Sequence, residues 1–372
     1  MQITQELRNL INIMLEKKAA DLIITAGQPP LIRIVGDLFP VGEKKLDSED
    51  VAKFAYGVLT SEQFKKFEAT NEVDSSFGIE DIARFRVNVF RQQGAVGMVI
   101  RMLPFEIPTL ESLGVPSLVK DWLMTPHGII ITTGPTGSGK STTQAGMIGL
   151  LNQKKRNHVV TIEDPIEFTH KHGLCTIEQR EVGRDTASFS SALKYVFRQS
   201  PDVIMIGEMR DRETFEAALQ LAETGHLVLA TLHTGDAMQA ITRIVDVFPT
   251  EQHQQVRVQL SLTLIGVLVQ QLVPCLDGKS RVLATEVLQV SPAVRNLIRK
   301  NELQQIYSVL QTGSSEGMIT MNGSLMDLFR QGKISFEQAM LFTTRQKELE
   351  EMMARETKIV NTAKKAVTSS VR

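Results

Sequence analysis

The chain has 372 residues, of which 42% are hydrophobic and 22% are charged, and its formal net charge is −1. This length exceeds what one hydrophobic core usually serves, so we expect at least two domains, and the balanced charge offers no general basic surface for nucleic acid. The two cysteines, Cys175 and Cys275, are too few and too far apart for a four-cysteine zinc site or a disulfide framework.

The first hundred residues combine short strand and helix patterns. Residues 1–18 carry charges throughout and have apolar residues at helical spacing, which predicts an amphipathic helix rather than a signal peptide. Two further helices are expected within 47–69. Strands are expected at 19–26, in a hairpin over 29–41, and at 72–79, 83–93 and 96–103. We therefore expect a small α+β domain over residues 1–104.

A linker and a larger domain are expected next. Residues 105–117 contain two prolines and a glycine without sustained periodicity, which predicts an interdomain linker. From 118 to 344 strand patterns alternate with helix patterns, which is typical of a parallel or mixed sheet covered by helices. Its strands are expected at 129–133, 158–164, 175–181, 201–208, 226–233 and 282–289. The apolar-striped stretch 250–275 predicts one long helix.

The end of the chain differs in composition from the rest. Residues 345–372 are polar and heavily charged, which predicts a helix that frays into a flexible tail. No run of about 18 apolar residues occurs anywhere in the sequence, so we expect no membrane span. The chain is expected in the cytoplasm, where any role at a membrane would pass through a partner.

A glycine-rich loop within 128–143 carries the strongest chemical signal. It follows an apolar, β-branched strand pattern, precedes a helix pattern and matches G-x-x-x-x-G-K-[ST]. Glycines let the backbone turn its N–H groups toward phosphate oxygens, Lys140 can reach the β- and γ-phosphates, and the Ser141 hydroxyl can bind Mg²⁺. The alternative is a chance match in a glycine-rich turn, which the flanking strand and helix disfavour. The predicted nucleotide-binding residues are Gly134, Pro135, Thr136, Gly137, Ser138, Gly139, Lys140, Ser141 and Thr142.

Two acidic strand ends are candidates for metal and water contacts. The apolar strand at 203–208 ends on Glu208, which is placed to contact Mg²⁺ directly or through water; the alternative is a cap for the following helix. Glu163, Asp164 and Glu167 lie within five residues of one another at the end of another strand. One of them could polarise the attacking water as general base, and the alternative is a solvated turn.

Histidines and arginines supply weaker candidates. His226 and His233 flank one strand, but a metal pair lacks a third ligand, so a group sensing phosphate or a neighbouring subunit is the more plausible function. An ordinary strand-end histidine is the alternative for each. Arg86 and Arg101 lie in strands of the small domain, either at its surface or as arginines that complete a phosphate site from another domain.

Taken together, these blocks resemble the secretion ATPase superfamily, most closely the PilT/PilU branch of type IV pilus motors. The resemblance covers nearly the whole chain. It is carried by GPTGSGKSTT, TIEDPIEF, PDVIMIGEMRDRET and TGHLVLATLHT, with QREVGRDT and AVRNLIRK in support. The last segment resembles the family's AIRNLIRE element, from which it departs at Val294 and Lys300.

The resemblance implies a PAS-like N-terminal domain, a RecA-like P-loop NTPase core and a ring-shaped homohexamer with ATP at domain and subunit interfaces. Carried over by position, Lys140 and Ser141 bind phosphate and Mg²⁺, and Glu208 is the Walker B acid. Glu167 matches the acid thought to act as general base, and His233 is the His-box residue with His226 nearby. Arg86 and Arg101 match arginines that reach the nucleotide across domains.

The family's activity is Mg²⁺-dependent ATP hydrolysis coupled to movement. The resemblance implies a motor at the inner face of the cytoplasmic membrane that drives an inner-membrane platform protein, disassembles the pilus and so powers twitching motility. An accessory PilU-like subunit acting with a paralogous motor remains an alternative. A pilus-extension or type II secretion ATPase is another, although such relatives usually carry a four-cysteine zinc element and an additional N-terminal domain. A RecA-like DNA translocase is disfavoured by the balanced charge.

Overall fold

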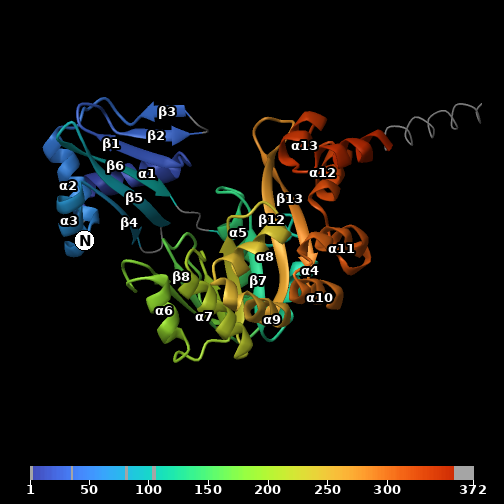
Figure 1. Cartoon of the computed structure of the whole chain (residues 1–372). Helices are drawn as coiled ribbons and strands as arrows, with labels where there is room; N and C mark the ends of the chain where they lie inside the picture. Colours follow the sequence, from blue (N-terminus) through green and yellow to red (C-terminus); the bar gives the residue numbers. More distant parts are fainter. Residues whose placement is uncertain (1–2, 35–36, 80–82, 103–105, 356–372) are drawn as a thin grey trace, which may run out of the picture. The chain divides into compact units, whose positions relative to one another are not determined.

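A computed structural model describes residues 3–34, 37–79, 83–102 and 106–355 (Figure 1). The described chain divides into two compact units. The first comprises residues up to 106 together with 167–169, and the second comprises the rest from 107 onward. Each unit has hydrophobic clusters of its own and is described by itself.

The first unit is a six-stranded antiparallel sheet packed against helices. Its strands are β1 (Asp21–Thr25), β2 (Leu31–Ile34), β3 (Asp37–Pro40), β4 (Glu72–Ile79), β5 (Ala83–Gln92) and β6 (Ala95–Met102), in the order β3-β2-β1-β6-β5-β4. Its helices are α1 (Gln5–Glu16), α2 (Ser48–Val58) and α3 (Ser61–Thr70). The alternating residues Phe85, Val87 and Val89 of β5 are fully buried in one core with the apolar faces of the helices, as their spacing predicts.

The second unit is built on a seven-stranded mixed sheet. Its strands are β7 (Gly128–Thr133), β8 (His158–Glu163), β9 (Thr176–Glu181), β10 (Val203–Ile206), β11 (Leu227–Leu232), β12 (Leu264–Pro274) and β13 (Arg281–Gln289), in the order β13-β12-β7-β11-β10-β8-β9. The pairing is parallel except between β12 and β13, which run antiparallel.

Helices cover both faces of this sheet (Figure 1). They are α4 (Leu118–Met124), α5 (Lys140–Lys154), α6 (Phe189–Val196), α7 (Arg212–Glu223), α8 (Ala237–Asp246), α9 (His253–Thr263), α10 (Pro292–Lys300), α11 (Ile306–Thr312), α12 (Met321–Arg330) and α13 (Phe336–Phe342). Ile129 and Ile131 of β7 pack into one cluster, whereas Ile130 packs into the cluster on the other face. A strand buried on both faces is continuously apolar, which is the pattern that the sequence shows at 129–131.

The prediction of one long helix over 250–275 is wrong. Helix α9 ends at Thr263, and the chain continues as β12, which pairs with β7 on one side and with β13 on the other. The residues from Leu264 to Val269 are buried. A short apolar run buried on both faces has the same sequence pattern as a buried helix, so periodicity could not separate the two structures.

Two segments with weak periodicity pack closely in the second unit. Of the stretch predicted as a linker, residues 107–117 belong to this unit, where Leu110 and Val115 are buried. Residues 346–355 are helical, and Leu349 and Met353 are buried in the core. The remainder of the predicted tail, 356–372, lies outside the described residues. Within the described ranges, no helix combines the length and apolarity needed to cross a membrane.

Candidate active site

Four predicted motifs meet at one edge of the second unit's sheet. Strands β7, β11, β10 and β8 are adjacent and parallel, so their carboxyl ends share that edge. The glycine loop follows β7, His233 follows β11, Glu208 follows β10, and Glu163 ends β8. In open α/β sheets, ligands bind beyond the carboxyl ends of the strands, so this edge is the candidate site.

The glycine loop is held against strand β12. Gly134 has a φ of +145°, and a Cβ atom there would lie 2.2 Å from the carbonyl oxygen of Gln270, so only glycine fits without movement. The Gln270 side chain also donates from Nε2 to Thr143 Oγ1 at 2.7 Å, which fixes the start of α5. Lys140 is buried and donates from Nζ to the carbonyl oxygens of Gly134 and Pro135 at 2.8 and 3.0 Å.

The loop has the features of an anion site. The N-cap residue of α5 is Gly139, which has no side chain to satisfy the first N–H groups of the helix. Such groups and the helix dipole favour a bound phosphate. The hydroxyl of Ser138 is buried and has no hydrogen-bond partner among the described residues. A phosphate oxygen would satisfy it.

Hydrogen bonds tie the ends of β7 and β11 together. Thr133 Oγ1 accepts from the backbone N–H of Thr234 at 2.8 Å and lies 2.9 Å from the Thr234 hydroxyl. Thr133 immediately precedes Gly134, and Thr234 immediately follows His233. The glycine loop and the histidine turn are therefore positioned by one pair of contacts.

Glu208 is the centre of a small charged cluster. Arg210 donates from Nη2 to Glu208 Oε2 at 2.7 Å, and His233 Nε2 lies 3.4 Å from Glu208 Oε1. The hydrogen bond from Arg210 holds the pKa of Glu208 below its ordinary value. The carboxyl group is therefore ionised at neutral pH, as a magnesium contact requires.

The oxygen donors available at this edge fit Mg²⁺. The described residues contain no group of three or more His, Cys, Asp or Glu side chains arranged to hold a metal ion. Magnesium in nucleotide sites is typically bound by one or two protein oxygens together with phosphates and water. The Ser141 hydroxyl in the first turn of α5 and the Glu208 carboxylate are donors of that kind.

Glu163 is engaged in the sheet. Its Oε1 accepts from Thr161 Oγ1 at 2.6 Å and from Gln179 Nε2 at 3.0 Å, and the residue is buried. These contacts suit an acid that orders the strand ends. Glu167 belongs to the segment grouped with the first unit, so its assignment as general base stays a prediction.

The two histidines lie at opposite ends of β11. Pairing of Leu227 with Gly128 and of Leu232 with Thr133 places His226 at the amino end of the strand, about 20 Å from the loop at the strand spacing of 3.3 Å per residue. His226 Nδ1 lies 2.9 Å from the carbonyl oxygen of Leu221. Within one chain the structure therefore brings His233 to the site and leaves His226 away from it.

The two arginines of the first unit lie side by side. Register pairs Arg86 of β5 with Arg101 of β6, so both side chains share one face of the sheet. Arg101 Nε donates to Asp21 Oδ1 at 2.7 Å, while Arg86 Nε is 3.8 Å from Asp74 Oδ1. The Arg101 side chain is largely exposed and the Arg86 side chain is half-buried, and their contact with a nucleotide stays a prediction.

Sequence reasoning missed three residues that shape the site: Arg210, Thr234 and Gln270. Arg210 lies two positions after a strand-end carboxylate, a spacing that could have suggested an ion pair. The other two act through partners more than a hundred residues away in the sequence, for which a single sequence gives no signal.

The site consists of a strand, a glycine loop and a helix that begins at Lys140, with a carboxylate from a neighbouring strand beside them. This arrangement defines a P-loop nucleoside triphosphatase. A family model described as "Type II/IV secretion system protein" matches residues 75–370, and the chain belongs to that family.

Comparisons with known proteins place pilus motors among its relatives. The chain is 45% identical over 334 residues to the "Type IV pilus retractation ATPase PilT" of Pseudomonas aeruginosa, covering 90% of this chain and 97% of that protein. It is 44% identical over 335 residues to the "Type IV pilus ATPase PilU" of the same organism, covering 90% and 88%. A solved structure of "the Pilus Retraction Motor PilT and Bound ADP" matches with a TM-score of 0.87 and 47% identity, over 92% of this chain and 98% of that one. This likeness confirms the predicted fold class, an α+β domain followed by a nucleotide-binding α/β core.

Proposed function

We propose that this chain is a Mg²⁺-dependent ATPase that powers the retraction of type IV pili. The observation that carries the proposal is the meeting of Lys140, Ser141, Glu208 and His233 at one sheet edge, in a chain similar over nearly its full length to a pilus retraction ATPase. Retraction is the relative's named activity, and it is carried to this chain as part of the proposal.

Each residue of the site has a part in the proposed chemistry. The loop N–H groups and Lys140 hold the phosphates, which places the γ-phosphoryl group for attack by water. Bound Mg²⁺ would neutralise charge on the β- and γ-phosphate oxygens, with Ser141 and Glu208 as its protein contacts. His233, 3.4 Å from Glu208, orients that carboxylate and senses the γ-phosphate in this proposal. Glu167 accepts the proton of the attacking water.

The proposal extends to an assembly. We infer a homohexamer in which Arg86 and Arg101 complete the phosphate site, so that ATP has different affinity for open and closed arrangements of the units. Its partner is an inner-membrane platform protein, and it acts at the cytoplasmic face of that membrane. An accessory role beside a paralogous motor is the second candidate, because identity to the PilU relative is nearly the same as to the PilT relative.

Two experiments test these proposals. Purified chain should hydrolyse ATP only with Mg²⁺, Lys140→Ala should abolish hydrolysis, and Lys154→Ala, an exposed lysine at the end of the same helix, should not. ATP hydrolysis by the Lys140→Ala protein would contradict the assignment of this loop as the nucleotide site. Deletion of the gene should give hyperpiliated, non-motile cells; bald cells would indicate pilus extension, and wild-type behaviour would indicate an accessory subunit.

A further inference from the structure

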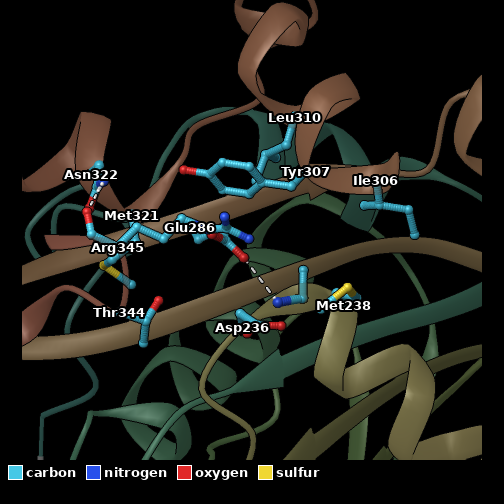
Figure 2. Close-up of a pocket in the computed structure, with 11 residues that line it drawn as sticks. Asp236, Met238, Glu286, Ile306, Tyr307, Leu310, Met321, Asn322, Thr344 and Arg345 are labelled. Atoms are coloured by element: carbon cyan, nitrogen blue, oxygen red, sulfur yellow. Dashed lines mark hydrogen bonds between the residues drawn. The ribbon is translucent and has the colours of Figure 1, made fainter. Parts of the chain in front are cut away.

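A buried carboxylate lies in a pocket lined by β13, α8 and the C-terminal helices. Glu286 of β13 is 5% exposed and lines a cavity of about 20 Å³, enough for about one water molecule. Figure 2 shows it between the start of α8, marked by Asp236, and Tyr307 with Arg345 on the other side. None of the predicted motifs includes Glu286.

The carboxylate is bound at the start of α8. Its Oε1 accepts a hydrogen bond from the backbone N–H of Ala237, the first residue of α8, at 2.9 Å. Met321, the first residue of α12, lines the same pocket, and its backbone N–H lowers the pKa of this carboxyl group. Two helix N-termini therefore converge on one acid, and each favours negative charge there.

The start of α8 is also the end of the turn that carries the active-site histidine. Ala237 lies three residues after Thr234, which bonds to Thr133 at the base of the glycine loop. His233 immediately precedes Thr234, and its Nε2 lies 3.4 Å from Glu208 Oε1. The turn 233–237 is thus held on one side by Thr133 and on the other by Glu286.

The opposite wall of the pocket belongs to the C-terminal segments. The Arg345 guanidinium lies over the ring of Tyr307, 3.5 Å from its centroid, and the Tyr307 hydroxyl donates to Glu348 at 2.7 Å. Glu286 accordingly links the turn beside the nucleotide site to the layer formed by α11, α12 and the helix 346–355.

We propose that Glu286 is a positioning residue for ATP turnover, which holds the His233–Thr234 turn in place by binding the start of α8. This inference rests on the proposed function, since turnover is one of its measures. The competing explanation is a purely structural cap that stabilises α12 without affecting the site. The two explanations differ in which segment should show faster amide hydrogen exchange and in which kinetic constant should change.

The test variant is Glu286→Gln, which keeps the size of the side chain and replaces one acceptor oxygen with a donor. We expect kcat to fall roughly tenfold, the cost of about one weakened hydrogen bond, while KM for ATP changes by less than about twofold because the loop residues are untouched. Amide hydrogen exchange should quicken in peptides covering 230–240. Glu348→Gln is the matched control, with the same chemical change in the same layer but no bond to α8.

A double-mutant comparison tests whether Glu286 acts through the turn that Thr133 also holds. Thr133→Val removes the bonds to Thr234 at nearly constant volume, so the losses of kcat from Thr133→Val and Glu286→Gln should be less than multiplicative when combined. Multiplicative losses, or faster exchange confined to 300–355, would overturn the inference. A wild-type protein that hydrolyses no ATP would refute the proposed function instead, and the exchange result would still decide whether Glu286 holds the turn.

Discussion

Burial of Glu286 should make the second unit less stable as the pH rises through neutrality. The pKa of this carboxyl group is raised from 4.5 to about 7, chiefly by burial and also by the nearby charge of Asp236, against the lowering effect of the Ala237 backbone N–H. Because the folded chain binds the proton more tightly than the unfolded chain, the stabilisation is complete below about pH 4.5 and is lost as the pH rises through about 7.

The size of the effect follows from this pKa. A tenfold difference in proton affinity corresponds to about 1.4 kcal/mol, so a rise from 4.5 to about 7 corresponds to about 3 kcal/mol. Gln has the shape of the neutral carboxyl group and no proton to lose. Between about pH 5 and pH 8, the free energy of unfolding of Glu286→Gln should therefore improve relative to wild type by about 2–3 kcal/mol.

Trp122 provides the assay. It is the only tryptophan in the sequence, it is 2% exposed, and its indole N–H donates to Gln289 on β13, the strand that carries Glu286. Its fluorescence during urea unfolding should report the second unit. Glu316→Gln, at an exposed carboxyl group, is the control and should show no such pH dependence. An equal difference between Glu286→Gln and wild type at both pH values would refute the reasoning.

Three further predictions concern the site. Gly134→Ala should lower stability by about 1–3 kcal/mol and weaken ATP binding, because the new methyl group must displace the Gln270 carbonyl 2.2 Å away; urea unfolding and nucleotide titration check this, and wild-type values for both would contradict it. Arg210→Ala should raise the pKa of Glu208 toward its ordinary value, since that hydrogen bond is the main cause of its lowering; the acid limb of the turnover profile should move to higher pH, and an unmoved limb would separate Arg210 from catalysis. Glu167→Gln should bind ATP and leave it largely uncleaved in a single-turnover assay, so normal turnover would remove Glu167 as general base.

What the sequence could predict depended on how local each feature is. The residues around Lys140 form one contiguous motif whose strand, loop and helix can be recognised in a single window, and the structure has that order. Glu208 and His233 were found because each ends an apolar strand. The carboxyl ends of neighbouring parallel strands meet at one edge, so placing the strands also placed these side chains.

Features set by distant pairing could not be predicted in this way. Strand β12 was mistaken for helix because its neighbours β7 and β13, rather than its own periodicity, determine its conformation. The contacts of Thr133 with Thr234 and of Ala237 with Glu286 join residues 101 and 49 positions apart. No spacing rule in a single sequence connects such pairs, which tertiary packing alone brings together.

The packing of the helix 346–355 bears on where this chain can be cut or joined to another. Leu349 is fully buried and Met353 nearly so, and Arg345 covers the ring of Tyr307. A truncation at residue 345, where the charged composition begins, would remove two buried side chains from the core. It would also expose apolar surface that promotes aggregation. A shortened protein made for crystals or assays should therefore retain residues through 355.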